Sequence, residues 1–215
     1  MSKSILLRQR VRLAIAARDF RARTEGVAAI EFALIVPILA SLFIGAVEMS
    51  QAVTANRRVT QVASSTGDLV ARVDTNIKDT DVLDIMKIGS YLLSPLATTT
   101  LKVDIRVVGS SPTDATNTKL IWICSYDASN AGSVNCTCPS TKPGYAIPTG
   151  LVSTNDYVVI SDVNYGYKPT LFDYYMKKSY GGSGGVYAMK ETVYLKPRSL
   201  APQLVIGAGP TCPLT

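Results

Sequence analysis

The sequence contains no histidine, which is the most common general base and metal ligand in enzymes. Ser-His and Cys-His catalytic arrangements are therefore excluded. The chain also lacks a phosphate-binding loop ending in Gly-Lys-Ser/Thr, a G-x-G-x-x-G dinucleotide motif and a G-x-S-x-G elbow. No Lys-Ser/Thr pair follows the glycine-rich stretch 181–185, so we interpret this stretch as a flexible hairpin loop.

The carboxylates of the C-terminal half are scattered and form no recognisable catalytic set. We interpret them as solvated strand and loop residues; they are Asp156, Asp162, Asp173 and Glu191. We therefore expect a protein that is not an enzyme and that has no cofactor and no metal site.

Charged residues are also scarce, at 18% of the chain, and the positive charge is concentrated at one end. Residues 1–26 hold seven basic and two acidic residues, which account for +5 of the formal net charge of +6. A surface that binds nucleic acid would carry its basic residues on the folded part of the chain. The charge distribution therefore predicts no nucleic-acid partner and indicates membrane topology.

An apolar run follows this basic leader directly. Residues 27–47 contain a single charge, Glu31, and as a helix they would be ~31 Å long, which is the thickness of a bilayer core. The run is longer than the apolar region of a cleaved secretory signal. We expect a transmembrane helix over 27–47 with the basic N-terminus in the cytoplasm and residues 48–215 on the other side of the membrane. Pro37 inside the run is expected to kink the helix without ending it.

Beyond the span, the pattern changes from helical to period two. Apolar residues at Val59, Val62, Ala63, Thr66, Leu69, Val70 and Val73 have helical spacing, so we expect one long helix over about 27–73. The alternative is two helices hinged near Gly45 or Gly67. A second helix is expected over 79–93, and strands over 101–107, 120–126, 157–167 and 186–195, with a long loop over 127–155. Helices followed by strands predict an α+β fold with a mainly antiparallel sheet of about four strands.

The four cysteines, Cys124, Cys136, Cys138 and Cys212, all fall in the part expected outside the cytoplasm. An even count in an oxidising compartment predicts two disulfides. A bond between Cys136 and Cys138 would be strained, so each should pair with Cys124 or Cys212, in either combination. The alternatives are an all-cysteine zinc site, which lacks C-x-x-C spacing here, and free buried thiols.

The junction of leader and apolar run reads Gly26-Val27-Ala28-Ala29-Ile30-Glu31-Phe32. This motif resembles the processing site of Flp-type prepilins, and the segment from Glu25 to Glu48 resembles the TadE/TadG-like family of tight-adherence pilus proteins. Two C-terminal segments, 163–169 and 194–198, resemble strands of that family more weakly; Lys196 stands where the family usually has arginine. The length of the chain places it nearer to TadE-like minor pseudopilins than to the short major pilins.

The resemblance implies that a membrane-embedded prepilin peptidase cuts after Gly26, so that Glu31 becomes the fifth residue of the mature chain. It also implies partners among other pilin-like subunits and pilus assembly proteins in the bacterial inner membrane. From its position alone, Glu31 has a second interpretation: it lies one turn inside the span, so its carboxylate could extend to the cytoplasmic surface of the membrane. The alternative function is an uncleaved single-pass inner-membrane protein whose periplasmic domain binds other secretion or pilus components.

Overall fold

The computed structural model describes residues 26–130, 133–169, 186–198, 201–209 and 211–214. The chain divides into two compact units, Met1–Val47 and Glu48–Thr215. The glycine-rich stretch 181–185 and Asp173 lie outside the described residues.

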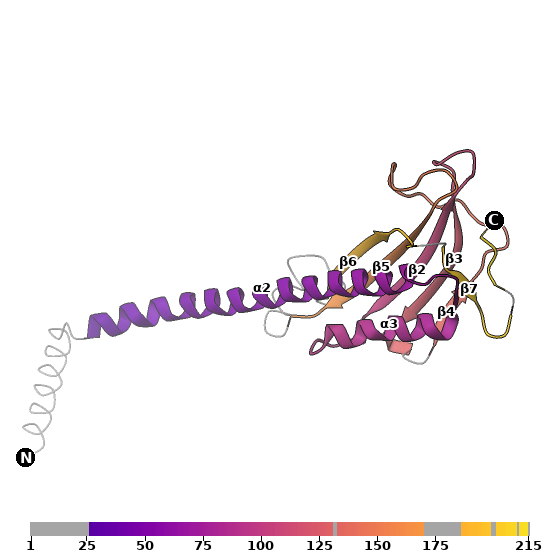
Figure 1. The fold of residues 1–215 in the computed structure, drawn as a ribbon. Coiled ribbons are helices and arrows are strands. Elements are labelled where there is room, and N and C mark those ends of the chain that lie inside the picture. The colour runs from indigo at the N-terminus through magenta and orange to yellow at the C-terminus, as the bar shows by residue number, and fades with distance from the viewer. Residues whose placement is uncertain (1–25, 131–132, 170–185, 199–200, 210, 215) are drawn as a thin grey trace, which may run out of the picture. The chain divides into compact units, whose positions relative to one another are not determined.

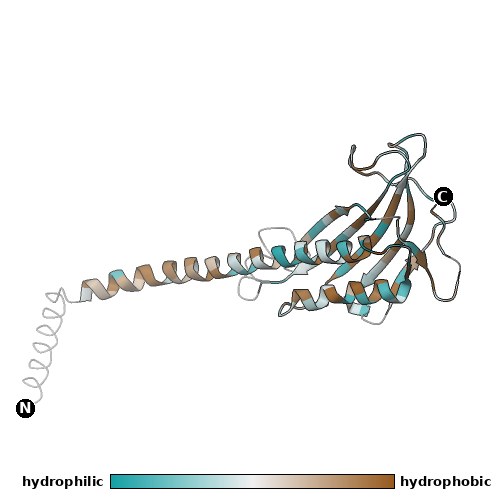
Figure 2. Ribbon diagram, in the orientation of Figure 1, coloured by the Kyte–Doolittle hydropathy of each residue, from teal (hydrophilic) through white to brown (hydrophobic). Residues whose placement is uncertain are grey.

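The first described element is α2 (Val27–Ala71), a single α-helix of 45 residues. The predicted long helix is confirmed, with its end two residues earlier than expected, and no hinge divides it at Gly45 or Gly67. Pro37 lies inside α2 without ending it. Apolar colour surrounds the first half of α2, whereas polar residues are interspersed along the second half (Figure 2).

The second unit contains α3 (Asp79–Leu93) and a five-stranded sheet, so the predicted α+β fold is confirmed. The sheet order is β4-β3-β2-β5-β6, and each neighbouring pair is antiparallel. The strands are β2 (Lys102–Ser110), β3 (Thr118–Asp127), β4 (Val134–Thr137), β5 (Tyr157–Tyr167) and β6 (Tyr187–Leu195). Helix α3 and the second half of α2 both lie along the sheet (Figure 1).

The main core lies between these helices and the sheet. The residues of α2 that it buries have the predicted helical spacing and include Val59, Val62 and Val70, although Leu69 is 37% exposed. Gly67 is a point of close approach to the sheet, because a Cβ there would lie 2.4 Å from Leu195 and 3.1 Å from Ser161. The hydroxyls of Thr66 and Ser161 are 3.1 Å apart beside it. The glycine that weakens the isolated helix thus allows α2 to pack on β5 and β6.

A β-bulge changes the orientation of β3 residues. Val107 pairs with Trp122 but Val108 pairs with Leu120, so Ile121 is the extra residue of β3. Trp122, Cys124 and Tyr126 face the main core as expected. Leu120, which the alternating pattern places with them, instead packs on the opposite face of the sheet with Val108, Val158, Ile160 and three loop residues, Tyr145, Ile147 and Val152.

The predicted loop 127–155 therefore contains two ordered parts. Its first part includes β4, a fifth strand that sequence patterning missed because its short Val-Asn-Cys-Thr segment has little apolar alternation. Its second part covers the outer face of the sheet over the Val108 cluster.

A small parallel sheet, also not predicted, joins distant parts of the chain. It pairs β1 (Asn76–Lys78) with β7 (Gln203–Val205) in register from Asn76–Gln203 to Lys78–Val205. The backbone N–H of Gln203 donates to the carbonyl of Thr75 at 2.9 Å. The C-terminal segment thereby returns to the start of α3.

Candidate functional site

The candidate processing motif lies at the beginning of α2. The α-helix starts at Val27, and Gly26 is the residue directly before it. A Cβ on Gly26 would meet nothing within 4 Å, and the φ angle of this residue is not in the left-handed region. The described part of the chain therefore has no conformational or packing reason for glycine at this position.

The apolar residues of α2 from Val27 to Val47 are largely exposed. Phe32 is 69% exposed, Phe43 is 71% exposed, and the most apolar stretch of α2 has no buried residue. Within the described chain, α2 is the one helix long and apolar enough to cross a membrane. Glu31 is exposed one turn inside this helix and has no hydrogen bond or ion pair to another described residue.

The four cysteines form two disulfides, one within the β3–β4 hairpin and one between the end of that hairpin and the C-terminal segment. Cys124 on β3 is bonded to Cys136, its register partner on β4, and Cys138 is bonded to Cys212. The described residues hold no free cysteine and no group of three or more residues that could bind a metal. One bond closes the β3–β4 hairpin, and the other joins that hairpin to residues 74 positions later.

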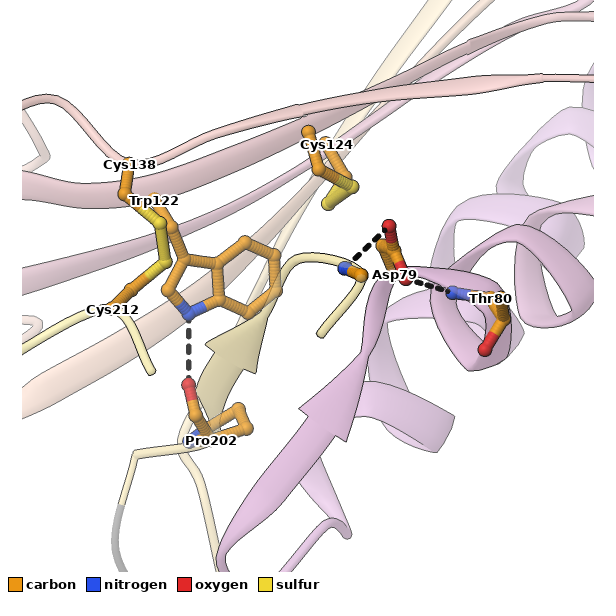
Figure 3. The surroundings of a disulfide bond; sticks show 9 residues. Asp79, Thr80, Trp122, Cys124, Cys138, Pro202 and Cys212 are labelled. Atoms are coloured by element: carbon orange, nitrogen blue, oxygen red, sulfur yellow. Dashed lines mark hydrogen bonds between the residues drawn. A yellow bond between two sulfur atoms is a disulfide. The ribbon is translucent and has the colours of Figure 1, made fainter. Parts of the chain in front are cut away.

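The Cys138–Cys212 disulfide is part of a wider attachment of the C-terminal segment (Figure 3). The indole of Trp122 lies next to it and donates to the carbonyl of Pro202 at 2.8 Å. Asp79, the first residue of α3, accepts hydrogen bonds from the backbone N–H groups of Thr80 and Gly207. The attachment therefore combines a covalent bond, a buried hydrogen bond and the β1–β7 pair.

Two carboxylates that we interpreted as solvated are held in ion pairs. Asp162 on β5 is buried, forms an ion pair with Arg106 and accepts a hydrogen bond from Thr192. Asp156 is paired with Lys196 at 2.7 Å. Because antiparallel pairing places β2, β5 and β6 side by side, positions far apart in the sequence meet here. Glu191 lies on β6 and is half-buried.

The two C-terminal segments with a family resemblance form adjacent strands. Tyr165 and Tyr167 lie at the end of β5 and pair with Met189 and Tyr187 of β6. Burial raises the pKa of both tyrosine hydroxyls, and that of Tyr165 donates to the carbonyl of Ala97 at 2.9 Å. These tyrosines are packed structural residues of the second unit.

Together these features define a class of protein in which an apolar helix, long enough to span a membrane, precedes a disulfide-bonded α+β unit. The family model of TadE-like proteins matches residues 26–67, from the candidate processing glycine to Gly67 in the packed part of α2. This match confirms the TadE/TadG-like resemblance and supports a part for the chain in tight-adherence pilus assembly. No curated protein and no solved structure matches the chain.

Proposed function

We propose that the chain is a non-enzymatic, pilin-like subunit, a minor pseudopilin, for assembly of a tight-adherence Flp-type pilus. Residues 1–26 are a cytoplasmic leader that a prepilin peptidase removes after Gly26. Residues 27–47 anchor the mature chain in the bacterial inner membrane, and residues 48–215 lie in the periplasm or outside the cell. Its partners are other pilin-like subunits and pilus assembly proteins.

The observation that carries this proposal is the glycine at position 26. The TadE-like match begins there, although the described structure gives glycine no packing or conformational advantage over other residues. A residue without a side chain at an exposed junction suits a peptidase active site, which must approach the backbone there closely. The basic leader and the apolar helix meet at the same residue.

Glu31 gives the proposal a mechanism for assembly. A carboxylate inside an apolar span costs up to ~3 kcal/mol at the bilayer centre and less near the interface. Cleavage after Gly26 creates an ammonium on Val27, which lies at i, i+4 from Glu31 in the same chain. When two subunits pack side by side with their helices staggered, the Glu31 carboxylate of one subunit can instead pair with the Val27 ammonium of the other. A neighbour in the wrong register leaves Glu31 unpaired, so the pair selects one register.

The test of this mechanism is Glu31→Gln, which removes the charge but keeps the size of the side chain. We expect this variant to stay folded in the membrane and to be processed, but to lose most of its crosslinking to other pilin-like subunits. Glu31→Asp, one methylene shorter, should be intermediate.

The matched control is Glu48→Gln, at the other end of the apolar run, with all variants compared at equal expression. If Glu31→Gln is crosslinked and supports piliation as well as the unsubstituted chain does, the assembly mechanism is wrong. A retained leader together with unchanged association would favour the uncleaved inner-membrane protein.

A further inference from the structure

A pocket of about 220 Å³ lies in the second unit, beside the end of β2, the start of β3 and the loop that connects them. It involves neither the candidate processing motif nor the disulfides. Two lysines, Lys119 from β3 and Lys142 from the loop after β4, contribute to its wall. Ser111, Asn155 and the ring of Tyr157 are also part of the lining.

The backbone forms this pocket through two irregular features. Ile121, the extra residue of the bulge, lines it and is 4% exposed. Gly109 lies against the aromatic ring of Tyr157, because a Cβ there would be 2.7 Å from Cε1 of that ring. Bulges are frequent beside functional sites, where they redirect neighbouring side chains. Here the lining combines apolar residues with two lysines.

Lys142 is the unusual residue of the pocket. Its Nζ is buried, and no hydrogen-bond acceptor contacts it among the described residues. Its backbone has a φ of 39°, in the left-handed region that side-chain-bearing residues seldom adopt. Burial, together with the positive charge of Lys119, lowers the pKa of the Lys142 ammonium. A buried ammonium without an acceptor is costly, so an acceptor supplied to Lys142 would stabilise the fold.

Carboxylates near the pocket in the sequence are already engaged elsewhere. Asp156 follows Asn155 but pairs with Lys196 at 2.7 Å. Asp114, in the β2–β3 loop, accepts hydrogen bonds from the backbone N–H and hydroxyl of Thr116. Neither of these carboxylates therefore pairs with the two lysines that line the pocket.

We propose that this pocket binds a small anionic ligand, whose carboxylate or phosphate group accepts hydrogen bonds from Lys119 and from Lys142, once the buried ammonium of Lys142 turns toward the pocket. Each ammonium has three donors, so one oxyanion can be held by both. Tyr157 and Ile121 contact the uncharged body of the ligand. The pocket is smaller than the ~300–1,000 Å³ of sites that enclose drug-sized molecules, so it fits a small molecule or the terminal group of a larger one.

The test measures thermal unfolding of the full chain in detergent, followed by fluorescence of Trp122. The probes are inorganic phosphate and glucuronate, each compared with sodium chloride at equal ionic strength. At tenfold the dissociation constant, a bound anion should raise the unfolding midpoint by about 3–6 °C. A response to phosphate alone or to glucuronate alone identifies which anionic group the pocket prefers.

Lys142→Met and Lys119→Met should abolish or greatly reduce this rise, whereas Lys190→Met, an exposed lysine on β6, should leave it unchanged. Without anion, Lys142→Met should unfold at the same temperature as the unsubstituted chain or at a higher one, because it removes an unpaired buried charge. The proposal is overturned if neither probe stabilises the chain beyond chloride, if all variants respond alike, or if Lys142→Met is less stable without anion.

Discussion

At the scale of single residues, Gly89 shows why α3 lies so close to α2. It is buried on α3, and a Cβ there would lie 2.8 Å from Cγ1 of Val62, a fully buried and conformationally stiff side chain. Alanine would add about 1 kcal/mol of helix propensity, but overpacking costs about 1–3 kcal/mol. We expect Gly89→Ala to lower the free energy of unfolding by up to about 2 kcal/mol, and Gly89→Val to lower it further.

Urea unfolding, followed by Trp122 fluorescence, measures this loss. The matched control is Gly45→Ala, because a Cβ on Gly45 meets nothing within 4 Å. A Gly89→Ala chain that is as stable as the unsubstituted one would show that the two helices can separate without cost.

Asp127 predicts a particular dependence of stability on pH. The hydrogen bond from Lys102, at 2.9 Å, is the largest of the effects that lower its pKa to about 2; Ser129 adds two further donors. Because the folded-state pKa lies below the unfolded value, this stabilisation is present above about pH 4 and is lost as pH falls through about 2. The side chain of Lys102 is 62% exposed and that of Asp127 is 31% exposed, so solvent screens the pair and the effect is small.

The substitution Asp127→Asn should therefore lower the unfolding midpoint slightly at pH 7, and its difference from the unsubstituted chain should shrink between pH 4 and 2. Lys102→Met should remove most of the same pH dependence. Unfolding midpoints measured from pH 7 to 2 check both expectations, and a difference that stays constant over this range would contradict them.

At the scale of elements, the two disulfides have different consequences because they close loops of different length. Their cysteines are separated by 12 residues in Cys124–Cys136 and by 74 in Cys138–Cys212. In the chain-entropy account, the shorter loop contributes about 3 kcal/mol and the longer one about 4–5 kcal/mol. We expect the double variant Cys138→Ala/Cys212→Ala to lose more stability in urea than Cys124→Ala/Cys136→Ala.

Peptide mapping of the unreduced protein gives an independent check of the pairing. It should recover one peptide pair joined through Cys124 and Cys136 and another joined through Cys138 and Cys212. Four alkylatable thiols, or one zinc ion per chain, would refute the disulfides.

Elements formed by local patterns could be predicted from the sequence, whereas those formed by distant pairing could not. Apolar spacing identified α2, α3 and four strands, because each carries its own period of burial. The β1–β7 pair joins residues 76–78 to 203–205, and β4 depends on its partner β3 for its conformation. The Lys142 pocket escaped prediction because five separate segments form it. The processing motif could be recognised because its residues are contiguous.

At the scale of the whole molecule, the chain combines an exposed apolar helix segment with a disulfide-bonded unit. The part of α2 up to Val47 has exposed apolar side chains, which water disfavours and lipid or neighbouring helices accommodate. The second unit has its own core between α2, α3 and the sheet. Cleavage between Gly26 and Val27 would replace the leader with a free ammonium at the start of the helix.

The N-terminal residue of the protein recovered from its native membranes tests the central proposal most directly. Intact mass and N-terminal sequencing should show a chain that begins at Val27, and substitution of Gly26 by a bulkier residue, such as Gly26→Leu, should leave residues 1–26 attached. Phe43→Leu, a conservative change elsewhere in the apolar run, serves as the processing control and should still be cut. Native protein that retains residues 1–26 in cells with an active prepilin peptidase would contradict the proposal.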